Sequence, residues 1–356
     1  MSKMKGVKKL RVAIIGAGVS GLACAHELER HGVKPDIYEQ RPRSGDLFEH
    51  VGVLLQVMNR PVKDQIEEIK ESCHISIKPL NLVNKVTMYA PRASGSICGK
   101  LGYLIKRGQG VDAVENQLFS LVKTPVRYNF RADCAALARK YDYVIVASGT
   151  YDITKILGCW EDVYKTWLMG ATVLGSFETD EIKMWLNTEY AKSGYAYLTP
   201  FNHESASLIL VVSNANRKNI VDYWKKFWQI ENFTFKISSL WDWEHVSGFV
   251  YPHQVGNILF AGNAGGFMEP VLGFALFDAI RSGVYAARSI VEGGKYEDYL
   301  ARLKENIWAS IKLRKVLNRF TNKDYDHLIA ILTAPGIKQF VYNTNLDIIK
   351  HLAGIL

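Results

Sequence analysis

The pattern of apolar and polar positions predicts a chain of alternating strands and helices that is interrupted by a block of strands. An apolar run at residues 10–15 is typical of a buried parallel strand, and we expect a helix after it to about residue 31. A second strand is expected at 34–38. Apolar spacings of three and four predict helices at 62–71 and 111–122. Further strands are expected at 75–77, 83–89, 101–105 and 143–147.

Between residues 151 and 243 the pattern becomes aromatic and alternating. Strands of an antiparallel sheet are expected there at 166–177, 195–199, 208–213 and 233–239, with one helix at 216–228. A short strand at 258–261 and a long helix at 273–291 follow, and then a helical tail at 296–320 and 325–332. The pattern predicts an α/β chain with a discontinuous nucleotide domain (1–73, 101–150 and 245–294), a substrate domain (74–100 and 151–244) and a helical segment (295–356).

The first strand leads into Gly16-Ala17-Gly18-Val19-Ser20-Gly21, the order of strand, glycine turn and helix that a dinucleotide site needs. Gly16 permits the tight turn, Gly18 lets the backbone approach a pyrophosphate, and Gly21 lets the helix pack closely on the strand. The helix N-terminus then faces the phosphate charge. Glu39 ends the second strand, 23 residues after Gly16, where a carboxylate can accept hydrogen bonds from a ribose. The sequence therefore predicts nucleotide binding.

Composition and cysteine usage narrow the class of protein. The chain has 356 residues and is 48% hydrophobic, which is enough for two domains with their own cores. Its five cysteines lie far apart and include no CxxC, so neither a disulfide framework nor a metal site is expected. We expect a reducing, cytoplasmic setting without a signal sequence or a membrane span.

The chain is basic, with a formal net charge of +9. A basic surface of this kind could dock an acidic electron-transfer protein or associate peripherally with an anionic membrane. A solvated basic surface that binds nothing in particular fits the charge equally well. Nucleic acid is not expected as a partner, because no recognised binding module accompanies the charge.

Four segments together resemble the flavoprotein superfamily of para-hydroxybenzoate hydroxylase, and within it most closely the geranylgeranyl reductases. The first is the glycine turn with Glu39, and the second is the stretch 39–45 that begins with this acid. The third is Arg107 followed by Asp112, although the spacing here is one residue longer than in the family. The fourth is 260–273, which is similar to the family's GDAAG...P..G segment. The resemblance implies a glutathione-reductase-like, Rossmann-type FAD domain with an inserted, mostly antiparallel sheet domain.

Asn263 is the main departure from the family, because an aspartate that bonds the ribityl chain of FAD is usual at its position. Asparagine can still bond a hydroxyl group but is neutral. This leaves open weaker or differently tuned FAD binding, or the loss of catalytic competence. The resemblance implies that the following residues contact FAD: Gly16, Gly18, Val19, Ser20, Gly21, Glu39, Gln40, Arg41, Gly45, Arg107, Gly149, Gly262, Asn263, Gly273 and Phe274.

A substrate pocket and a proton donor also follow from the resemblance. Residues 194–200 are similar to the YxWxFP signature of the reductases and to the WxWxIP signature of flavin-dependent halogenases, which implies that Tyr195, Tyr197 and Pro200 lie at the substrate. Alternating aromatic residues are equally typical of a packed sheet face. His50 aligns with a cysteine that lies beside the flavin in many reductases, and histidine can relay a proton near neutral pH. A hydrogen-bonded loop histidine is an equally good interpretation.

The function that these features indicate is an FAD-dependent oxidoreductase that reduces carbon-carbon double bonds of an isoprenoid-like or other apolar small molecule. The resemblance implies NAD(P)H or a reduced ferredoxin-type carrier as the electron donor. Two alternatives stay open. One is an FAD-dependent monooxygenase or halogenase-like enzyme, and the other is a non-catalytic FAD-binding protein.

Overall fold

A six-stranded sheet organises the nucleotide-binding half of the protein. The computed structural model describes residues 10–45, 48–336, 344 and 346–355. The strand order is β13-β14-β7-β1-β2-β6, and all neighbours are parallel except the hairpin of β13 and β14. The strands are β1 (Val12–Ile15), β2 (Asp36–Tyr38), β6 (Val126–Arg127), β7 (Tyr143–Val146), β13 (Gln254–Val255) and β14 (Ile258–Phe260).

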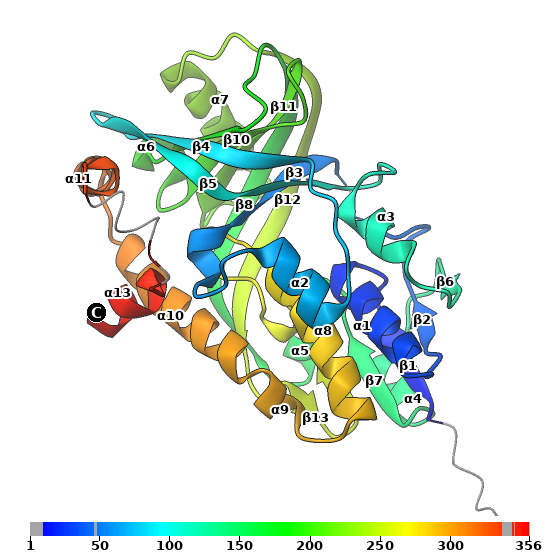
Figure 1. Ribbon diagram of the computed structural model, residues 1–356. Helices are drawn as coiled ribbons and strands as arrows, with labels where there is room; N and C mark the ends of the chain where they lie inside the picture. The colour runs from blue at the N-terminus through cyan, green and yellow to red at the C-terminus, as the bar shows by residue number, and fades with distance from the viewer. Residues whose placement is uncertain (1–9, 46–47, 337–343, 345, 356) are drawn as a thin grey trace, which may run out of the picture.

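Both faces of this sheet are buried, which explains why its central strands are continuously apolar. Val12 and Ile14 of β1 enter the core beneath α1 (Val19–Arg30) and α8 (Leu276–Val291), which pack against each other (Figure 1). Ala13 and Ile15 point to the opposite face and pack with Val250 and Phe260. The helices α2 (Gln65–Cys73), α3 (Val114–Phe119), α4 (Cys134–Ala138) and α5 (Asp152–Ile156) complete this half.

A larger, eight-stranded sheet forms the other half and lies above the first in Figure 1. Its order is β12-β8-β11-β10-β9-β4-β5-β3, and within it only β4 and β9 are parallel neighbours. Its strands are β3 (His50–Leu55), β4 (Asn81–Tyr89), β5 (Ser94–Arg107), β8 (Trp160–Leu174), β9 (Glu181–Trp185), β10 (Tyr195–Pro200), β11 (Ser205–Ser213) and β12 (Lys236–Val250).

Different elements pack on the two faces of the large sheet. One face packs against α7 (Ile220–Ile230) through a cluster that includes Leu208, Leu210 and Phe227. The other face carries Val51, Ile182 and other apolar residues, and α11 (Asn322–Thr333) covers part of it. The approach of α11 is close, because a Cβ on Gly95 of β5 would lie 2.5 Å from the Thr333 hydroxyl oxygen. The second face also looks toward the six-stranded sheet.

The remaining helices connect these layers or form the tail. They are η1 (Gln56–Asn59), α6 (Thr188–Ala191), η2 (Gly262–Gly265), α9 (Tyr296–Tyr299), α10 (Ala301–Leu317) and α13 (Ile348–Ile355). α13 packs on α10, as Figure 1 shows. Within the part of the chain that the structure describes, no helix is long and apolar enough to cross a membrane.

The expected α/β fold class is confirmed, and several elements differ from the prediction in their bounds or in kind. Residues 75–77 form no strand, because Ile75 and Ile77 bury their side chains in the core without a neighbouring strand to pair with. The strand expected at 233–239 instead runs to Val250, because it pairs with almost the whole length of β8. The helices expected at 111–122 and 273–291 begin later, at Val114 and Leu276.

Sheet pairing also departs from the expected domain boundaries at 50–55, 101–107 and 245–250. These segments were assigned to the nucleotide domain, yet β3, the second half of β5 and the end of β12 all pair within the eight-stranded sheet. The physical reason is local antiparallel pairing, in which His50 lies opposite Arg107 and Val250 opposite Trp160. Residues of the large sheet therefore line the same cavity as the glycine turn.

Candidate cofactor and substrate site

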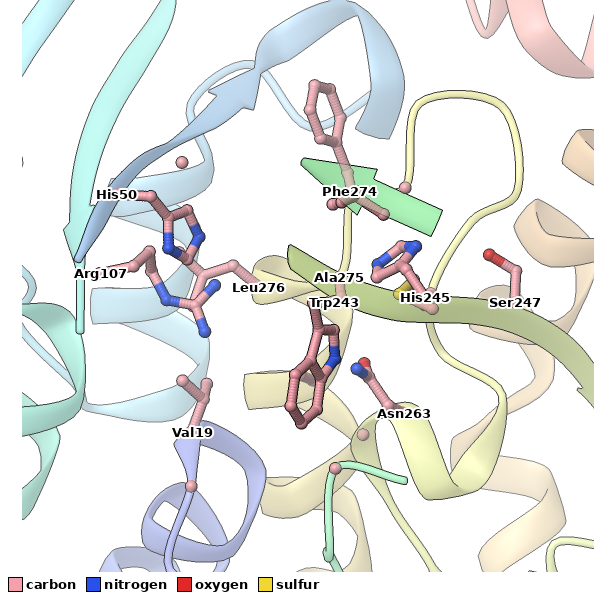
Figure 2. Close-up of a pocket in the computed structure, with 18 of the residues that line it drawn as sticks. Val19, His50, Arg107, Trp243, His245, Ser247, Asn263, Phe274, Ala275 and Leu276 are labelled. Carbon is pink, nitrogen blue, oxygen red and sulfur yellow. The ribbon is translucent and has the colours of Figure 1, made fainter. Parts of the chain in front are cut away.

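A cavity of about 470 Å³ lies between the two sheets and is lined by residues of both. The six-stranded half supplies the turn after β1, the end of β2, the segment after β7 and the segment between η2 and α8. The eight-stranded half supplies residues of all eight of its strands. Figure 2 shows residues from these distant parts of the chain around one space.

The three glycines of the turn differ in role: two allow close packing, and one leaves its backbone open for binding. A Cβ on Gly16 would lie 2.3 Å from the Ala147 carbonyl oxygen, and one on Gly21 would lie 2.0 Å from the Gly16 carbonyl oxygen. These two glycines allow close packing and do not line the cavity. A Cβ on Gly18 would meet no described atom within 4 Å, so this backbone faces open space. The buried Ser20 hydroxyl beside it has no hydrogen-bond partner among the described residues. An open cradle with an orphaned hydroxyl at a helix N-terminus fits a pyrophosphate.

Glu39 lies buried at the end of β2 and lines the same cavity. One carboxylate oxygen accepts a hydrogen bond from the Ala17 N–H at 2.9 Å. The other accepts from the Arg41 N–H at 2.9 Å and from Arg41 Nε at 3.2 Å. These contacts fix the carboxylate beside the glycine turn, and the oxygen that accepts from Ala17 keeps acceptor capacity for a ribose hydroxyl. Gln40, Arg41 and Gly45 line the cavity next to it.

The segment between η2 and α8 forms the facing wall. A Cβ on Gly262 would lie 2.9 Å from the Cβ of Ser20, which shows how closely this wall approaches the glycine turn. The buried Glu269 carboxylate accepts hydrogen bonds from the N–H groups of Val271 at 2.7 Å, Leu272 at 2.8 Å and Phe274 at 3.1 Å. Burial raises the pKa of Glu269, and these backbone hydrogen bonds oppose that effect. The carboxylate therefore fixes the turn that positions Gly273 and Phe274 at the cavity.

Asn263 lines the cavity from η2, as Figure 2 shows. We expect Asn263→Asp to change both FAD affinity and the reduction potential of the flavin while the fold stays intact. The carboxylate cannot donate a hydrogen bond, and its negative charge disfavours the addition of electrons to a nearby ring, so the potential should fall. Titration with FAD and potentiometry test this. An unchanged affinity and potential would place Asn263 away from the cofactor.

His50 and Arg107 are opposite each other on β3 and β5 and form one side of the cavity. The ring Nδ1 of His50 donates to the Phe48 carbonyl at 3.1 Å. Arg107 Nε donates to the Glu115 carboxylate at 2.6 Å, and Glu115 is only 1% exposed. This ion pair holds the guanidinium group toward the site. Asp112 is placed differently, in an ion pair with Lys106.

The end of the cavity under the large sheet is apolar. Tyr195 and Tyr197 line it, and their rings lie 5.8 Å apart. Burial raises the pKa of both phenols, so they are uncharged at neutral pH. The Tyr195 hydroxyl donates to the Leu272 carbonyl, which ties β10 to the wall before α8. The aliphatic residues here come from five strands: Val53, Leu55, Val86, Leu168, Ile182, Met184, Ile209 and Val211.

Most predicted site residues meet at this cavity, although their roles stay predictions. Those that line it are Gly18, Val19, Ser20, Glu39, Gln40, Arg41, Gly45, His50, Arg107, Gly149, Tyr195, Tyr197, Gly262, Asn263, Gly273 and Phe274. Gly16, Gly21 and Pro200 do not line it. Pro200 is buried at the end of β10, opposite Ala206 of β11. Among the described residues, no group of three or more His, Cys, Asp or Glu side chains could hold a metal ion.

Four residues of β12 line the cavity, although they are not among the predicted site residues. Trp241, Trp243, His245 and Ser247 are spaced two apart, so the pleat of the strand turns all four to the same face. The alternation was visible in the sequence. The predicted strand ends at residue 239, whereas β12 continues to Val250 and carries these residues to the cavity.

Comparisons with known proteins agree with this geometry. Residues 14–50 match the model of the NAD(P)-binding Rossmann-like domain. Over 47 residues the chain is 52% identical to the glutamate synthase (NADPH) small chain of Escherichia coli (strain K12), a match that covers 13% of this chain and 10% of that protein. The same protein from Halomonas elongata is 51% identical over 48 residues, again 10% of its length. The chain thus matches about a tenth of the length of these curated relatives.

Solved structures match nearly the whole chain. A geranylgeranyl bacteriochlorophyll reductase-like protein from Thermoplasma acidophilum superposes with a TM-score of 0.75 at 16% identity, covering 98% of this chain and 100% of that one. The flavin-dependent halogenase CmlS superposes with a TM-score of 0.64 at 15% identity, covering 98% and 77%. A flavoprotein/dehydrogenase from Cytophaga hutchinsonii gives 0.62 at 14%, covering 98% of each. The chain therefore has the fold that a geranylgeranyl bacteriochlorophyll reductase-like protein, a flavin-dependent halogenase and a flavoprotein/dehydrogenase share.

Proposed function

We propose that this chain is an FAD-dependent oxidoreductase that reduces carbon-carbon double bonds in an apolar, isoprenoid-like molecule. The observation that carries the proposal is that one cavity joins a nucleotide cradle to an apolar compartment. The cradle is polar and open at Gly18, whereas aliphatic and aromatic residues of the large sheet form the other end. A cofactor and an apolar molecule could thus meet without leaving the protein.

The residues present fit FAD. Gly18 and the orphaned Ser20 hydroxyl would hold the pyrophosphate, Glu39 the ribose, and Asn263 the ribityl chain. When bound, FAD supplies hydride chemistry that side chains cannot provide. The tasks of the protein are then to orient the molecule to be reduced, to exclude water and to supply a proton.

The protein's own residues suit these three tasks. The aliphatic side chains at the apolar end of the cavity, which include Val53 and Val211, exclude water and favour an apolar molecule. The two uncharged tyrosines line the cavity beside these aliphatic residues, and Tyr195 is held there by its hydrogen bond to the Leu272 carbonyl. His50 is a proton donor of the right type, because it lines the cavity and an imidazole can relay a proton near neutral pH.

Anaerobic turnover tests the proposal. Protein loaded with FAD and reduced with dithionite is mixed with a polyprenyl alcohol, so that the natural electron donor need not be known. We expect the flavin to reoxidise without oxygen and the product to gain two hydrogens per turnover. A strict need for oxygen, or a product with a new oxygen or halogen, would establish a monooxygenase or halogenase instead. Flavin that no unsaturated lipid reoxidises would favour a non-catalytic FAD-binding protein.

We expect His50→Ala to slow reoxidation of the reduced flavin by the substrate by about 100-fold and to flatten its pH dependence, because general acid catalysis contributes factors of this size. Stopped-flow measurements between pH 5 and 9 provide the readout. His203→Ala is the matched control, since His203 Nδ1 also donates to a backbone carbonyl, that of Phe177, but lies outside the cavity. A His50→Ala protein with the wild-type rate and pH profile would remove His50 from the reaction.

A further inference from the structure

A second cavity of about 480 Å³ adjoins the first around the edge strand β12. The residues that line both cavities are Phe48, Gly149, Thr150, Trp243, His245, Asn263 and Met268. Trp243 is therefore at the junction of the two spaces. Figure 2 shows its indole in the middle of the site, with Val19 and Arg107 on one side and Asn263 on the other.

The indole of Trp243 is uncovered in spite of this central place. The residue is 44% exposed, an unusual fraction for a large aromatic side chain between two layers of a protein. Phe48 contacts it edge to face, with ring centroids 6.0 Å apart. Much of the remaining indole surface faces the cavities. Such a surface can be covered by a ligand.

Trp243 is also held in place. Phe48 stacks on Trp241 at 4.9 Å with an angle of 8° between the rings. Trp241 in turn lies flat against Gly170 of the neighbouring strand β8, where a Cβ would be 2.2 Å from the indole. This series of contacts fixes the ring that supports Trp243. An aromatic group that is supported on one side and open on the other suits stacking with a planar ligand.

The second cavity does not itself resemble a binding site. Asp242 and Arg217 on its rim are already paired, because Trp167 Nε1 donates to Asp242 at 2.9 Å and Arg217 lies 3.6 Å from the same carboxylate. Arg217 is 79% exposed, so a charged ligand there would gain little over water. The space is better described as an approach from solvent to the first cavity, and Trp243 is where this approach ends.

We propose that Trp243 stacks on the flavin ring of bound FAD and screens it from solutes that enter through the second cavity. The proposal rests on the proposed binding of FAD. His50, Asn263 and Phe274 surround the space next to the indole, and they come from the segments in which the flavin is expected. A flavin ring there would cover the exposed indole surface. In turn, the indole would cover the flavin on the side of the second cavity.

Flavin fluorescence of the FAD-loaded protein tests this directly. An indole in contact with an excited flavin quenches its emission, whereas a phenyl ring does so poorly. Iodide added to the solution quenches only flavins that it can reach. We compare wild type with Trp243→Phe, which keeps a ring as a screen, and with Trp243→Ala, which removes the screen. Trp167→Ala is the control, because Trp167 lines only the second cavity.

We expect emission per bound flavin to rise severalfold in both Trp243 variants, and iodide quenching to increase only in Trp243→Ala. Trp167→Ala should match wild type in both measurements. Unchanged emission from flavin bound to Trp243→Phe would overturn the stacking, and unchanged iodide quenching in Trp243→Ala would overturn the screening. If Trp243→Ala binds no FAD, Trp243→Phe decides the outcome. The proposal then requires that Trp243→Phe binds FAD and that its bound flavin shows increased emission. Flavin absorbance of the wild type reports FAD binding separately, so that a failure of the proposed function is recognised on its own.

Discussion

Replacing Gly18 with leucine should give a folded protein that no longer holds FAD. The backbone of Gly18 has ordinary angles, φ −85° and ψ −169°, and a Cβ there would meet no described atom within 4 Å. The only expected cost is the loss of a favourable residue at the start of α1, about 1 kcal/mol. In the holoprotein, however, the leucine side chain would occupy the place where a pyrophosphate must approach the backbone.

The neighbouring glycines provide the contrast. Gly16→Ala and Gly21→Ala should destabilise the fold itself by about 1–3 kcal/mol, because each new methyl group would overlap a carbonyl oxygen. Thermal unfolding of the apoproteins and the ratio of flavin to protein absorbance separate the two effects. Gly18→Ala should fall between wild type and Gly18→Leu in FAD occupancy. Full FAD occupancy of Gly18→Leu would disprove that the pyrophosphate of FAD approaches the backbone of Gly18.

The nucleotide half of the fold was predictable because its signals are local. The apolar run of β1, the glycine turn and Glu39 lie within a single stretch, and each has one structural meaning in that order. The large sheet was harder to predict, because pairing between distant segments decides where its strands end. The pairing of β12 with β8 is what extends β12 to Val250. In the same way, the pairing of β3 with β5, which begins with His50 opposite Arg107, places β3 in this sheet.

The dependence on pairing between distant segments also explains which site residues could be predicted from the sequence. Segments similar to a known family led to the cradle, to Asn263 and to His50, all of which line the cavity. Trp243 and His245 carry no motif, and their place at the site follows from the length of β12. Pro200 shows the opposite error. It matches the signature in sequence, but the strand turns Tyr195 and Tyr197 to the cavity and leaves Pro200 outside the lining.

Glu269→Ala should destabilise the protein by about 3–5 kcal/mol and reduce FAD affinity, although Glu269 does not line the cavity. The substitution leaves the N–H groups of Val271, Leu272 and Phe274 without their acceptor in a buried turn. Each unsatisfied group costs about 1–3 kcal/mol if water cannot replace the carboxylate. The turn should then loosen, and with it the position of Gly273 and Phe274 at the cavity.

Glu269→Gln separates the effect of hydrogen bonding from that of charge. One carboxylate oxygen accepts from both Leu272 and Phe274, and a glutamine oxygen can replace it. The other accepts from Val271, and a glutamine NH₂ cannot. Since burial raises the pKa of Glu269, removing its charge should itself cost little. Urea unfolding should therefore rank wild type above Gln and Gln above Ala, and FAD titration should give the same order. A Gln variant as unstable as Ala would show that the charge, and not the three hydrogen bonds, holds the turn.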